Sequence, residues 1–326
     1  MNKVLLLTTN PNAMNGDFWT SFRRIERSLT SERSNWLRAT TAEEADIILF
    51  TDPTDSLLRD VRQHSIYKAH REKAMVNCDH DVAYPLVPGL YTSLRQGRFN
   101  PRWSEGGYYV KVLDHEWVIA TPLVTPSRHL CSFVGTFDTH PIRECLARID
   151  RSDVFVRDTS SGAGRLCGQS TTVYDSWKRE YAQSLCDSAF ILCPRGVAPS
   201  SYRIFEAMKA GRVPVIISDD WVAPVGPAWE QFSLRVAERH IARVAEVCAA
   251  NADRAADMGQ LAAIAFTDYF SIESCATTIL DRCMAIKSRC EGNIRRNQFS
   301  AALNGLTDLA MIRRTVVPAA KKWLTG

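Results

Sequence analysis

A group of arginine, serine and glycine residues in the middle of the chain has the composition of an anion-binding site. Its members are Arg195, Gly196, Ser200, Ser201 and Arg203. A guanidinium group can bind two phosphate oxygens at once, and a helix N-terminus offers free backbone N–H groups and the positive end of its dipole. The two arginines lie on either side of one expected helix start, so we predict that this group binds a diphosphate, with Gly196 allowing close backbone approach.

The elements that position this group follow the order strand, loop, helix, strand. Residues 189–193 form a short apolar run typical of a buried parallel strand, and the prolines and glycine after it prevent its continuation. An apolar stripe with helical spacing predicts the helix, which a preceding serine can cap and which Gly211 ends. Residues 213–217 supply the second strand, so the sequence predicts a βαβ unit.

Further candidate residues surround this unit. Glu206 lies one helical turn beyond Arg203, where a carboxylate can accept hydrogen bonds from the two hydroxyls of a ribose, although it can also pair with Arg203. Asp219 follows the second strand, at the edge where open α/β sheets bind ligands, or it caps the next turn. Gly135 can admit a ligand close to the backbone or simply form a turn. Arg143 can reach the diphosphate from the next helix or remain solvated.

Four short motifs resemble the exostosin family, glycosyltransferase family 47, over roughly residues 128–238. They are Cys-Pro-Arg-Gly at 193–196, Ser-x-Arg-x-Phe-Glu-Ala at 201–207, Ala-Gly-x-x-Pro-Val-Ile at 210–216 and Ser-Asp at 218–219. Phe-Val-Gly-Thr at 133–136 and Arg143 also look like the opening of that domain. The resemblance implies the α/β GT-B fold, with two facing Rossmann-like domains and a cleft between them. It also implies transfer of a sugar from a nucleotide-sugar donor, which we expect to be a UDP-sugar, to a glycan hydroxyl, with inversion and without a required metal or other cofactor.

An inverting transfer needs a base that takes the proton of the acceptor, and in GT-B enzymes this base usually comes from the N-terminal half. Asp79, His80 and Asp81 follow a predicted strand, and we expect one of them to be that base. Asp79 and Asp81 share a face if the backbone is extended. Such a cluster is equally typical of turns. Asp17 and Asp114 are weaker alternatives.

The length of 326 residues suits two domains. We predict an acceptor-side domain over residues 1–124 and a nucleotide-sugar-binding domain over residues 125–285. Residues 286–326 are expected to form a helical tail that packs back on the first domain. The remaining expected strands are 3–8, 45–51, 73–78, 108–113, 117–120, 130–136, 153–157 and 231–236, and the remaining expected helices are 241–256 and 272–287.

The composition is that of a globular protein, with 45% hydrophobic and 23% charged residues. A net charge of +4 with interspersed signs argues against nucleic-acid binding. The apolar stretch after Met1 is too short for a signal peptide, so we expect a cytoplasmic protein. Because animal and plant exostosins are usually anchored in the Golgi, we also expect a bacterial one.

The ten cysteines of the chain are expected to be reduced and to bind no metal. Basic pairs at 295–296, 313–314 and 321–322 suggest contact with the inner face of a membrane, or only a solvated helix face.

The sequence and this resemblance therefore predict a glycosyltransferase that extends a bacterial surface polysaccharide. Its expected partners are a nucleotide sugar and a glycan acceptor, with lipid-linked glycans among the candidate acceptors. Two alternatives remain open. One is a nucleotide-sugar epimerase with the same donor site, and the other is a non-catalytic nucleotide- or glycan-binding partner in a polysaccharide assembly complex.

Overall fold

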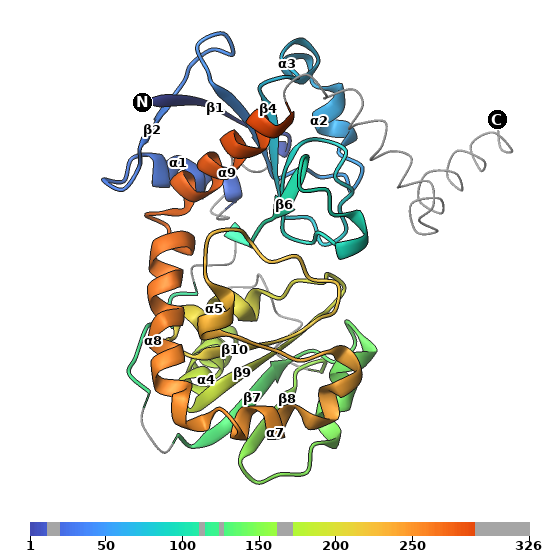
Figure 1. The fold of residues 1–326 in the computed structure, drawn as a ribbon, viewed down its shortest axis with the longest axis vertical. Helices are drawn as coiled ribbons and strands as arrows, with labels where there is room; N and C mark the ends of the chain where they lie inside the picture. Colours follow the sequence, from blue (N-terminus) through green and yellow to red (C-terminus); the bar gives the residue numbers. More distant parts are fainter. Residues whose placement is uncertain (12–19, 111–114, 124–126, 162–171, 291–326) are drawn as a thin grey trace, which may run out of the picture.

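The computed structural model of the chain describes residues 1–11, 20–110, 115–123, 127–161 and 172–290. These residues form two α/β domains, which lie one above the other in Figure 1. Each domain contains one sheet, and all neighbouring strands in both sheets are parallel.

The N-terminal sheet has six strands within the described residues, in the order β2-β1-β3-β4-β5-β6. They are β1 (Asn2–Thr8), β2 (Trp36–Arg38), β3 (Ile47–Thr51), β4 (Ala74–Cys78), β5 (Gly89–Tyr91) and β6 (Ser104–Gly106). The helices around it are α1 (Ser21–Leu29), α2 (Arg59–Gln63), α3 (Ser65–Ala69), the short η2 (Gln96–Arg98) and the returning α9 (Cys275–Cys290).

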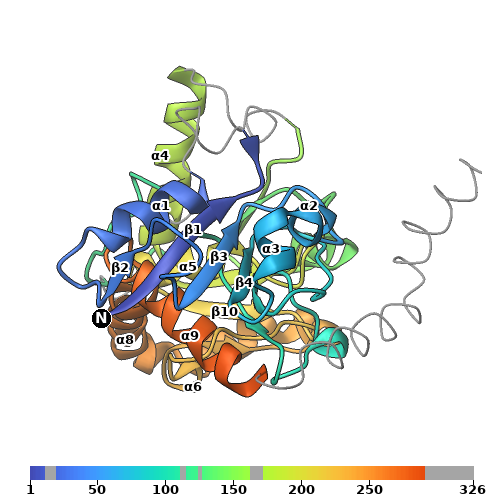
Figure 2. The same ribbon diagram turned by 90° about the horizontal axis from the view of Figure 1, so that it is seen from above.

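Alternate residues of the central strands point to opposite faces of this sheet, as the two-residue period of a strand requires. Leu6 and Leu49 pack with α1 and α9 on one face. Leu5 and Phe50 pack with α2 and α3 on the other face. Figure 2 shows the two helix layers on either side of the strands. The sheet is therefore buried between two layers of helices, which explains why its strands are continuous apolar runs.

The C-terminal sheet has five strands within the described residues, in the order β11-β10-β9-β7-β8. They are β7 (His129–Gly135), β8 (Val154–Asp158), β9 (Ser188–Pro194), β10 (Val213–Ile217) and β11 (Leu234–Arg235). The helical segments are η4 (Pro141–Arg148), α4 (Thr172–Cys186), α5 (Tyr202–Lys209), α6 (Trp229–Phe232), η6 (Glu238–Arg243), α7 (Val244–Ala249), η7 (Ala252–Arg254), α8 (Ala255–Ala265) and η8 (Phe266–Phe270). Helices α4, α5 and α8 cover one face and α7 the other.

The apolar stripe and the end of helix α5 are as the sequence predicts, but Ser201 at its N-cap makes no capping hydrogen bond. The residues of the stripe, Ile204, Phe205 and Met208, are fully buried. Gly211 has a positive φ of 71° and donates its N–H to Met208 O, while Arg212 N–H bonds to Ala207 O. These two bonds and the left-handed glycine form a Schellman motif, which ends the helix and leads directly into β10.

Helix α9 returns the chain to the N-terminal domain. Trp36 Nε1 donates to Asp281 Oδ1 over 2.8 Å. Arg282 makes two hydrogen bonds to the buried carboxylate of Glu105 in β6, at 2.7 and 2.6 Å, and Arg289 donates to the same carboxylate. The return therefore begins at Cys275, before the predicted domain limit at residue 285. The predicted tail beyond Cys290 and its basic pairs lie outside the described residues.

The two domains meet along the carboxyl ends of their strands. The segment after β5 and the segment after β10 form a bridge between Arg95 and Trp221. A Cβ atom on Gly106 would lie 2.3 Å from Val222 O, so a glycine is required where the two backbones pass. Two doubly wound parallel sheets that face each other in this way define the GT-B architecture, which confirms the predicted fold class.

Some of the expected elements are absent. Residues 108–110 and 117–120 form no strand, and residues 111–113 lie outside the described part of the chain. Tyr108 is buried because its ring packs against Phe205 and Phe270 of the other domain, and not because it belongs to a sheet. The expected strand at 231–236 is only the two-residue β11 after α6, and the expected helix at 241–256 is divided among η6, α7, η7 and α8. The other predicted strands and the helix at 272–287 are present.

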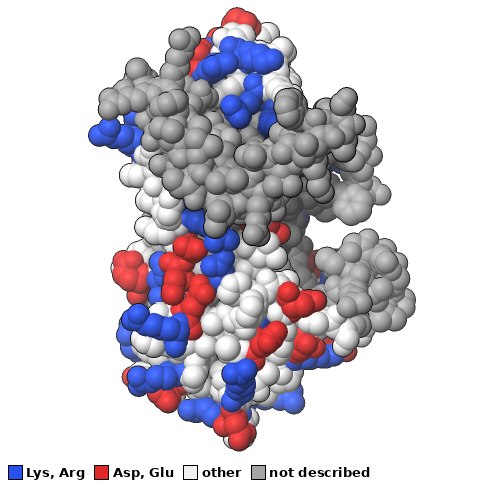
Figure 3. All heavy atoms as spheres, turned by 90° about the vertical axis from the view of Figure 1, so that its right-hand side faces the viewer, with Lys and Arg blue, Asp and Glu red and all other residues white. Residues whose placement is uncertain are grey.

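The surface has mixed charge. Figure 3 shows acidic and basic side chains interspersed on one face of the C-terminal domain, without a large region of a single sign. No helix in the described part of the chain is both long enough and apolar enough to cross a membrane.

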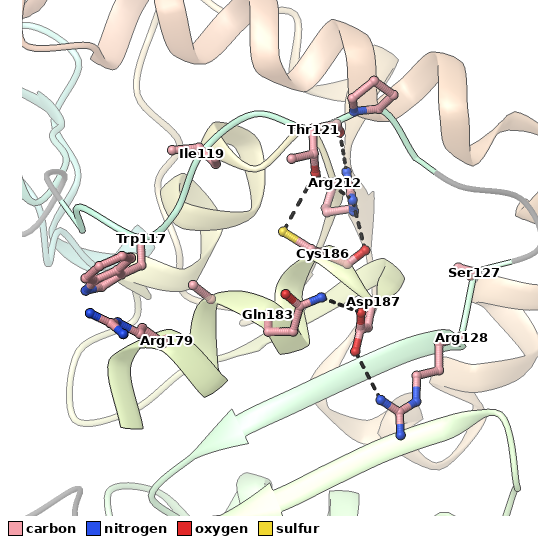
Figure 4. Close-up of a pocket in the computed structure, with 12 residues that line it drawn as sticks. Trp117, Ile119, Thr121, Ser127, Arg128, Arg179, Gln183, Cys186, Asp187 and Arg212 are labelled. Carbon is pink, nitrogen blue, oxygen red and sulfur yellow. Dashed lines mark hydrogen bonds and ion pairs between the residues drawn. The ribbon is translucent and has the colours of Figure 1, made fainter. Parts of the chain in front are cut away.

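Arg212 holds the linker between the domains, of which residues 115–123 are described, against the amino edge of the C-terminal sheet. This side chain is 1% exposed and lines a cavity of about 720 Å³ together with Trp117 and Arg128 (Figure 4). Its terminal nitrogens donate to Thr121 O at 2.8 Å and to Cys186 O at 2.9 Å, and also to Ala210 O, Gly211 O and Thr121 Oγ1. Arg212 therefore holds the linker against the loops that precede β9 and β10.

We predict that Arg212→Met destabilises the protein by about 2–4 kcal/mol, because it leaves several buried carbonyl oxygens without donors. Urea denaturation followed by tryptophan fluorescence measures this. Arg128→Ala is the matched control, since Arg128 lines the same cavity with a side chain that is 73% exposed and that pairs with Asp187 at the surface. Equal losses of unfolding free energy in the two variants would show that the hydrogen bonds of Arg212 to the linker do not stabilise the fold.

Candidate functional site

The predicted anion-binding residues gather at the carboxyl edge of the C-terminal sheet. Gly135 ends β7, Arg195 and Gly196 follow β9, and Ser200 and Ser201 precede α5. The strand order β8-β7-β9-β10-β11 places the point where the winding direction reverses between β7 and β9. Open α/β sheets bind ligands at this point, so the topology supports the predicted location.

Arg203 projects from α5 to the end of β7. Its side chain is 3% exposed, and Nε donates to Val134 O over 2.9 Å. The guanidinium carbon lies 4.7 Å from the centre of the Phe133 ring. A Cβ atom on Gly135 would lie 1.9 Å from Arg203 Nη2. Gly135 is therefore needed to admit the guanidinium group, which is a different use of the glycine from the two that the sequence suggested.

Several buried polar atoms at this edge make no hydrogen bond within the described part of the chain. They are Thr139 Oγ1, Arg195 Nε, Ser200 Oγ, Ser201 Oγ, Arg203 Nη1 and Ser218 Oγ. A buried polar group without a partner costs about 1–3 kcal/mol, and such groups are rare in native proteins. Ser201 occupies the N-cap position of α5 without making a capping bond. A cluster of unpaired donors beside a helix N-terminus and two arginines is suited to an anionic ligand with many oxygens.

Arg143 shapes the loop that carries this group. Its Nε donates to Arg195 O at 2.9 Å, Nη2 to Pro194 O at 3.3 Å and Nη1 to Thr136 O at 3.0 Å. Burial, and then the positive charge of Arg203, lower the pKa of Arg143 to about 10. A Cβ atom on Gly196 would lie 2.9 Å from Arg143 Nη2. These contacts join the loops after β7 and β9, while direct contact of Arg143 with a diphosphate stays a prediction.

Arg195 belongs to a network of charges at the domain boundary. Its Nη1 lies 3.5 Å from Asp220 Oδ2 and 3.6 Å from Glu238 Oε1. Asp220 Oδ2 also lies 3.2 Å from Arg95 Nη1 of the N-terminal domain. Asp219 is exposed and exchanges hydrogen bonds with Glu238, since the backbone N–H of each residue donates to the carboxylate of the other. These bonds join the end of β10 to the start of η6 and do not cap the turn that follows Asp219, contrary to the alternative that the sequence suggested. A role of Asp219 in ligand binding stays a prediction.

Glu206 is buried on α5, and its Oε2 accepts a hydrogen bond from the Tyr181 hydroxyl. Burial raises the pKa of the Glu206 carboxyl group above its ordinary value. The Tyr181 ring stacks on Trp177 with an interplanar angle of 13°. No pattern in the sequence indicates this role of Tyr181, because Tyr181 lies on α4 and its partner Glu206 on α5.

The predicted catalytic cluster follows β4 in the N-terminal domain. Asp79 is buried, His80 is partly exposed and Asp81 is exposed. Asp81 Oδ1 accepts from the Tyr109 hydroxyl, and the Tyr109 ring lies edge-on to Tyr202, the first residue of α5, with 6.3 Å between the ring centres. The structure therefore brings the cluster to the same domain boundary as the arginines. Asp17 and Asp114 lie outside the described residues.

The cavity beside Arg212 is not part of this site. Its lining residues include those that immediately precede β7, β9 and β10, so it lies at the amino edge of the sheet. No group of three or more histidine, cysteine, aspartate or glutamate side chains among the described residues is arranged to hold a metal ion.

The fold defines a two-domain GT-B protein, and its C-terminal domain carries the candidate anion-binding site. Residues 120–250 match the Exostosin GT47 domain, so this part of the chain is similar to the exostosin family. An exostosin-1 homolog of Caenorhabditis elegans is 37% identical over 83 residues, which are 25% of this chain and 21% of that protein. A probable beta-1,4-xylosyltransferase of Arabidopsis thaliana, IRX10, is 41% identical over 73 residues, which are 22% of this chain and 16% of the relative. The matches thus span about a fifth of the length of these curated relatives.

Among solved structures, the chain is similar to Anabaena HepE (Alr3699) in complex with UDP-glucose. The TM-score is 0.44 at 12% identity, over 87% of this chain and 100% of HepE. The assignment of the fold rests on the two parallel sheets themselves.

We predict that Gly135→Ala weakens the binding of pyrophosphate at least about tenfold, because the new methyl group displaces the Arg203 guanidinium. Isothermal titration calorimetry measures the affinity. Gly97→Ala is the matched control, since no atom lies within 4 Å of a Cβ at that position. Unchanged affinity in Gly135→Ala would show that the position of Arg203 does not matter for anion binding.

A second prediction concerns the buried carboxyl group of Glu206. Because burial raises its pKa in the folded state, its contribution to stability is present at low pH and is lost as the pH rises through that folded pKa. Glu206→Gln removes the titration, so the variant should become more stable relative to the wild type as the pH rises above about 4, the ordinary range of a glutamate. Urea midpoints measured as the pH rises give the difference, with the exposed Glu230→Gln as control. A difference in urea midpoint between Glu206→Gln and the wild type that stays constant with pH would contradict the raised pKa of Glu206.

Proposed function

We propose that this chain is a glycosyltransferase that transfers a sugar from a UDP-sugar to a hydroxyl group of a glycan, with inversion at the anomeric carbon. The observation that carries the proposal is the cluster of unpaired buried donors around Arg203 at the switch point of the C-terminal sheet. The match of this region to the Exostosin GT47 domain supports the same substrate class. Matching relatives are named probable glucuronosyltransferases and a xylosyltransferase, which supports transfer of a sugar.

In this proposal, the C-terminal domain binds the donor. Arg195, Arg203 and the serines before α5 bind the diphosphate, and Glu206 accepts hydrogen bonds from the ribose. As the bond between the anomeric carbon and the diphosphate breaks, negative charge grows on the leaving oxygen. Fixed guanidinium groups in a site of low dielectric constant stabilise that charge most effectively, because they need no reorientation.

The positive charge that the leaving group requires is supplied by these arginines and by the N-terminus of α5. We therefore propose that the reaction needs no divalent cation. The acceptor is proposed to be the growing end of a surface polysaccharide of a bacterium, as the resemblance to a polymer-building family suggests.

The test combines binding with product analysis. The purified protein is screened by thermal shift against UDP, GDP and CMP and against UDP-glucose, UDP-glucuronic acid, UDP-xylose and UDP-N-acetylglucosamine. Release of the nucleotide is then measured with and without a panel of p-nitrophenyl glycosides as acceptors, in the presence and absence of EDTA. We expect a shift with UDP compounds, release that depends on an acceptor, and no effect of EDTA.

Arg203→Ala should abolish the thermal shift with UDP while the variant stays folded. The substitution removes one hydrogen bond to Val134 O, and we expect it to weaken ligand binding more than it weakens the fold. Conversion of the donor into an isomeric UDP-sugar without acceptor would favour the epimerase. Binding without turnover for any donor and acceptor pair would favour the non-catalytic partner. An Arg203→Ala variant with unchanged affinity for UDP would contradict the assigned donor site.

A further inference from the structure

The three acidic and histidine residues after β4 differ in how their proton-accepting atoms are used. A base must have a free lone pair that can approach the acceptor hydroxyl, so the hydrogen bonds of each side chain decide whether it can act. Asp79, His80 and Asp81 can therefore be compared one at a time.

Asp79 uses both carboxylate oxygens inside the N-terminal domain. Oδ2 accepts from Ser21 Oγ at 2.7 Å, and Oδ1 accepts from Thr92 Oγ1 at 3.3 Å. The residue is only 3% exposed. These bonds join the start of α1 to the segment after β5, so Asp79 connects elements of the domain and does not present an oxygen to a substrate.

His80 is occupied in a different way. Its Nδ1 accepts a hydrogen bond from the backbone N–H of Val82 over 3.1 Å. A neutral imidazole that accepts at Nδ1 carries its proton at Nε2. With this hydrogen-bond arrangement neither nitrogen has a free lone pair, and the ring cannot take a proton from an acceptor.

Asp81 is the member of the cluster with an available oxygen. It is exposed, Oδ1 lies 3.4 Å from the Tyr109 hydroxyl that donates to it, and Oδ2 makes no hydrogen bond to any described residue. This bond is long, as catalytic hydrogen bonds often are before substrates bind. Tyr109 is 6% exposed and contacts Tyr202, whose ring lies 5.1 Å from the guanidinium carbon of Arg203. A chain of contacts thus connects Asp81 with the donor site across the domain boundary.

We propose that Asp81 is the base of the transfer and that Tyr109 is a positioning residue that directs its carboxylate toward the donor site. The inference rests on the proposed function. In the step, the acceptor oxygen forms a bond to the anomeric carbon while the bond from that carbon to the diphosphate oxygen breaks. The acceptor proton passes to Oδ2 of Asp81, and the electron pair of the broken bond leaves with the diphosphate.

Tyr109 is suited to this role because it remains a donor. Burial, and then the negative charge of Asp81, raise the pKa of the Tyr109 hydroxyl above its ordinary value. The hydroxyl therefore stays protonated at the pH at which a carboxylate base acts, and it can hold Oδ1 while leaving Oδ2 free. The edge-on packing of its ring against Tyr202 fixes the direction from which it donates.

The experiment is a double-mutant cycle on turnover, made with the UDP-sugar and p-nitrophenyl glycoside that give the fastest release of UDP in the wild type. Asp81→Asn should lower kcat on the order of 10²- to 10⁴-fold, and Tyr109→Phe about tenfold. Affinity for UDP, measured by calorimetry, should be unchanged in both variants. If Tyr109 acts through Asp81, the double variant should be no slower than Asp81→Asn alone.

Tyr108→Phe is the matched control, since it removes the hydroxyl of the adjacent buried tyrosine, which makes no hydrogen bond within the described part of the chain. Its kcat should equal that of the wild type. If the wild type turns over and Asp81→Asn has the same kcat, the assignment of the base is overturned and the proposed function is left intact. Additive losses in the double variant would overturn the positioning role of Tyr109. A wild-type protein that binds UDP without any turnover would overturn the proposed function and this inference together.

Discussion

The buried guanidinium group of Arg203 is the charge on which the arrangement of the C-terminal domain depends. A cation is costly to remove from water, and among the described residues its guanidinium group bonds to Val134 O and lies over the rings of Phe133 and Tyr202. Gly135 must lack a side chain to admit it. Arg143, a second buried cation, is close enough for its pKa to be lowered by Arg203. Two like charges held together repel each other, and an anion bound near the helix N-terminus would offset that repulsion.

The same edge of the sheet also fixes how the domains meet. Asp220 lies beside Arg195 of the candidate site and Arg95 of the other domain, and Tyr202, at the start of α5, contacts Tyr109. Residues of the site therefore form part of the domain boundary. A change in the relative position of the domains would alter the geometry of the arginines and of the carboxylate cluster together, so the contacts that align the domains also align the two halves of the site.

Local patterns in the sequence could predict the elements that carry the site, because each depends on neighbours a few residues away. The run through β9, α5 and β10 is of this kind, and so is the glycine at 211 that ends the helix. Contacts between domains leave no such pattern. Residues 108–110 have the apolar character of a strand because Tyr108 packs on Phe205 and Phe270 of the other domain. For the same reason, the hydroxyl of Tyr109 and its carboxylate partner could be recognised only in the folded chain.

A comparison of the two buried arginines at opposite edges of the C-terminal sheet separates stability from binding. Arg212, at the amino edge, uses both terminal nitrogens on oxygen atoms of the linker and neighbouring loops, and its Nε bonds to none of the described residues. Arg203, at the carboxyl edge, has a buried terminal nitrogen, Nη1, that bonds to none of the described residues. Folding alone would favour a partner for that nitrogen. Its unpaired state at the switch point of the sheet is therefore best explained by a ligand whose oxygens complete the site.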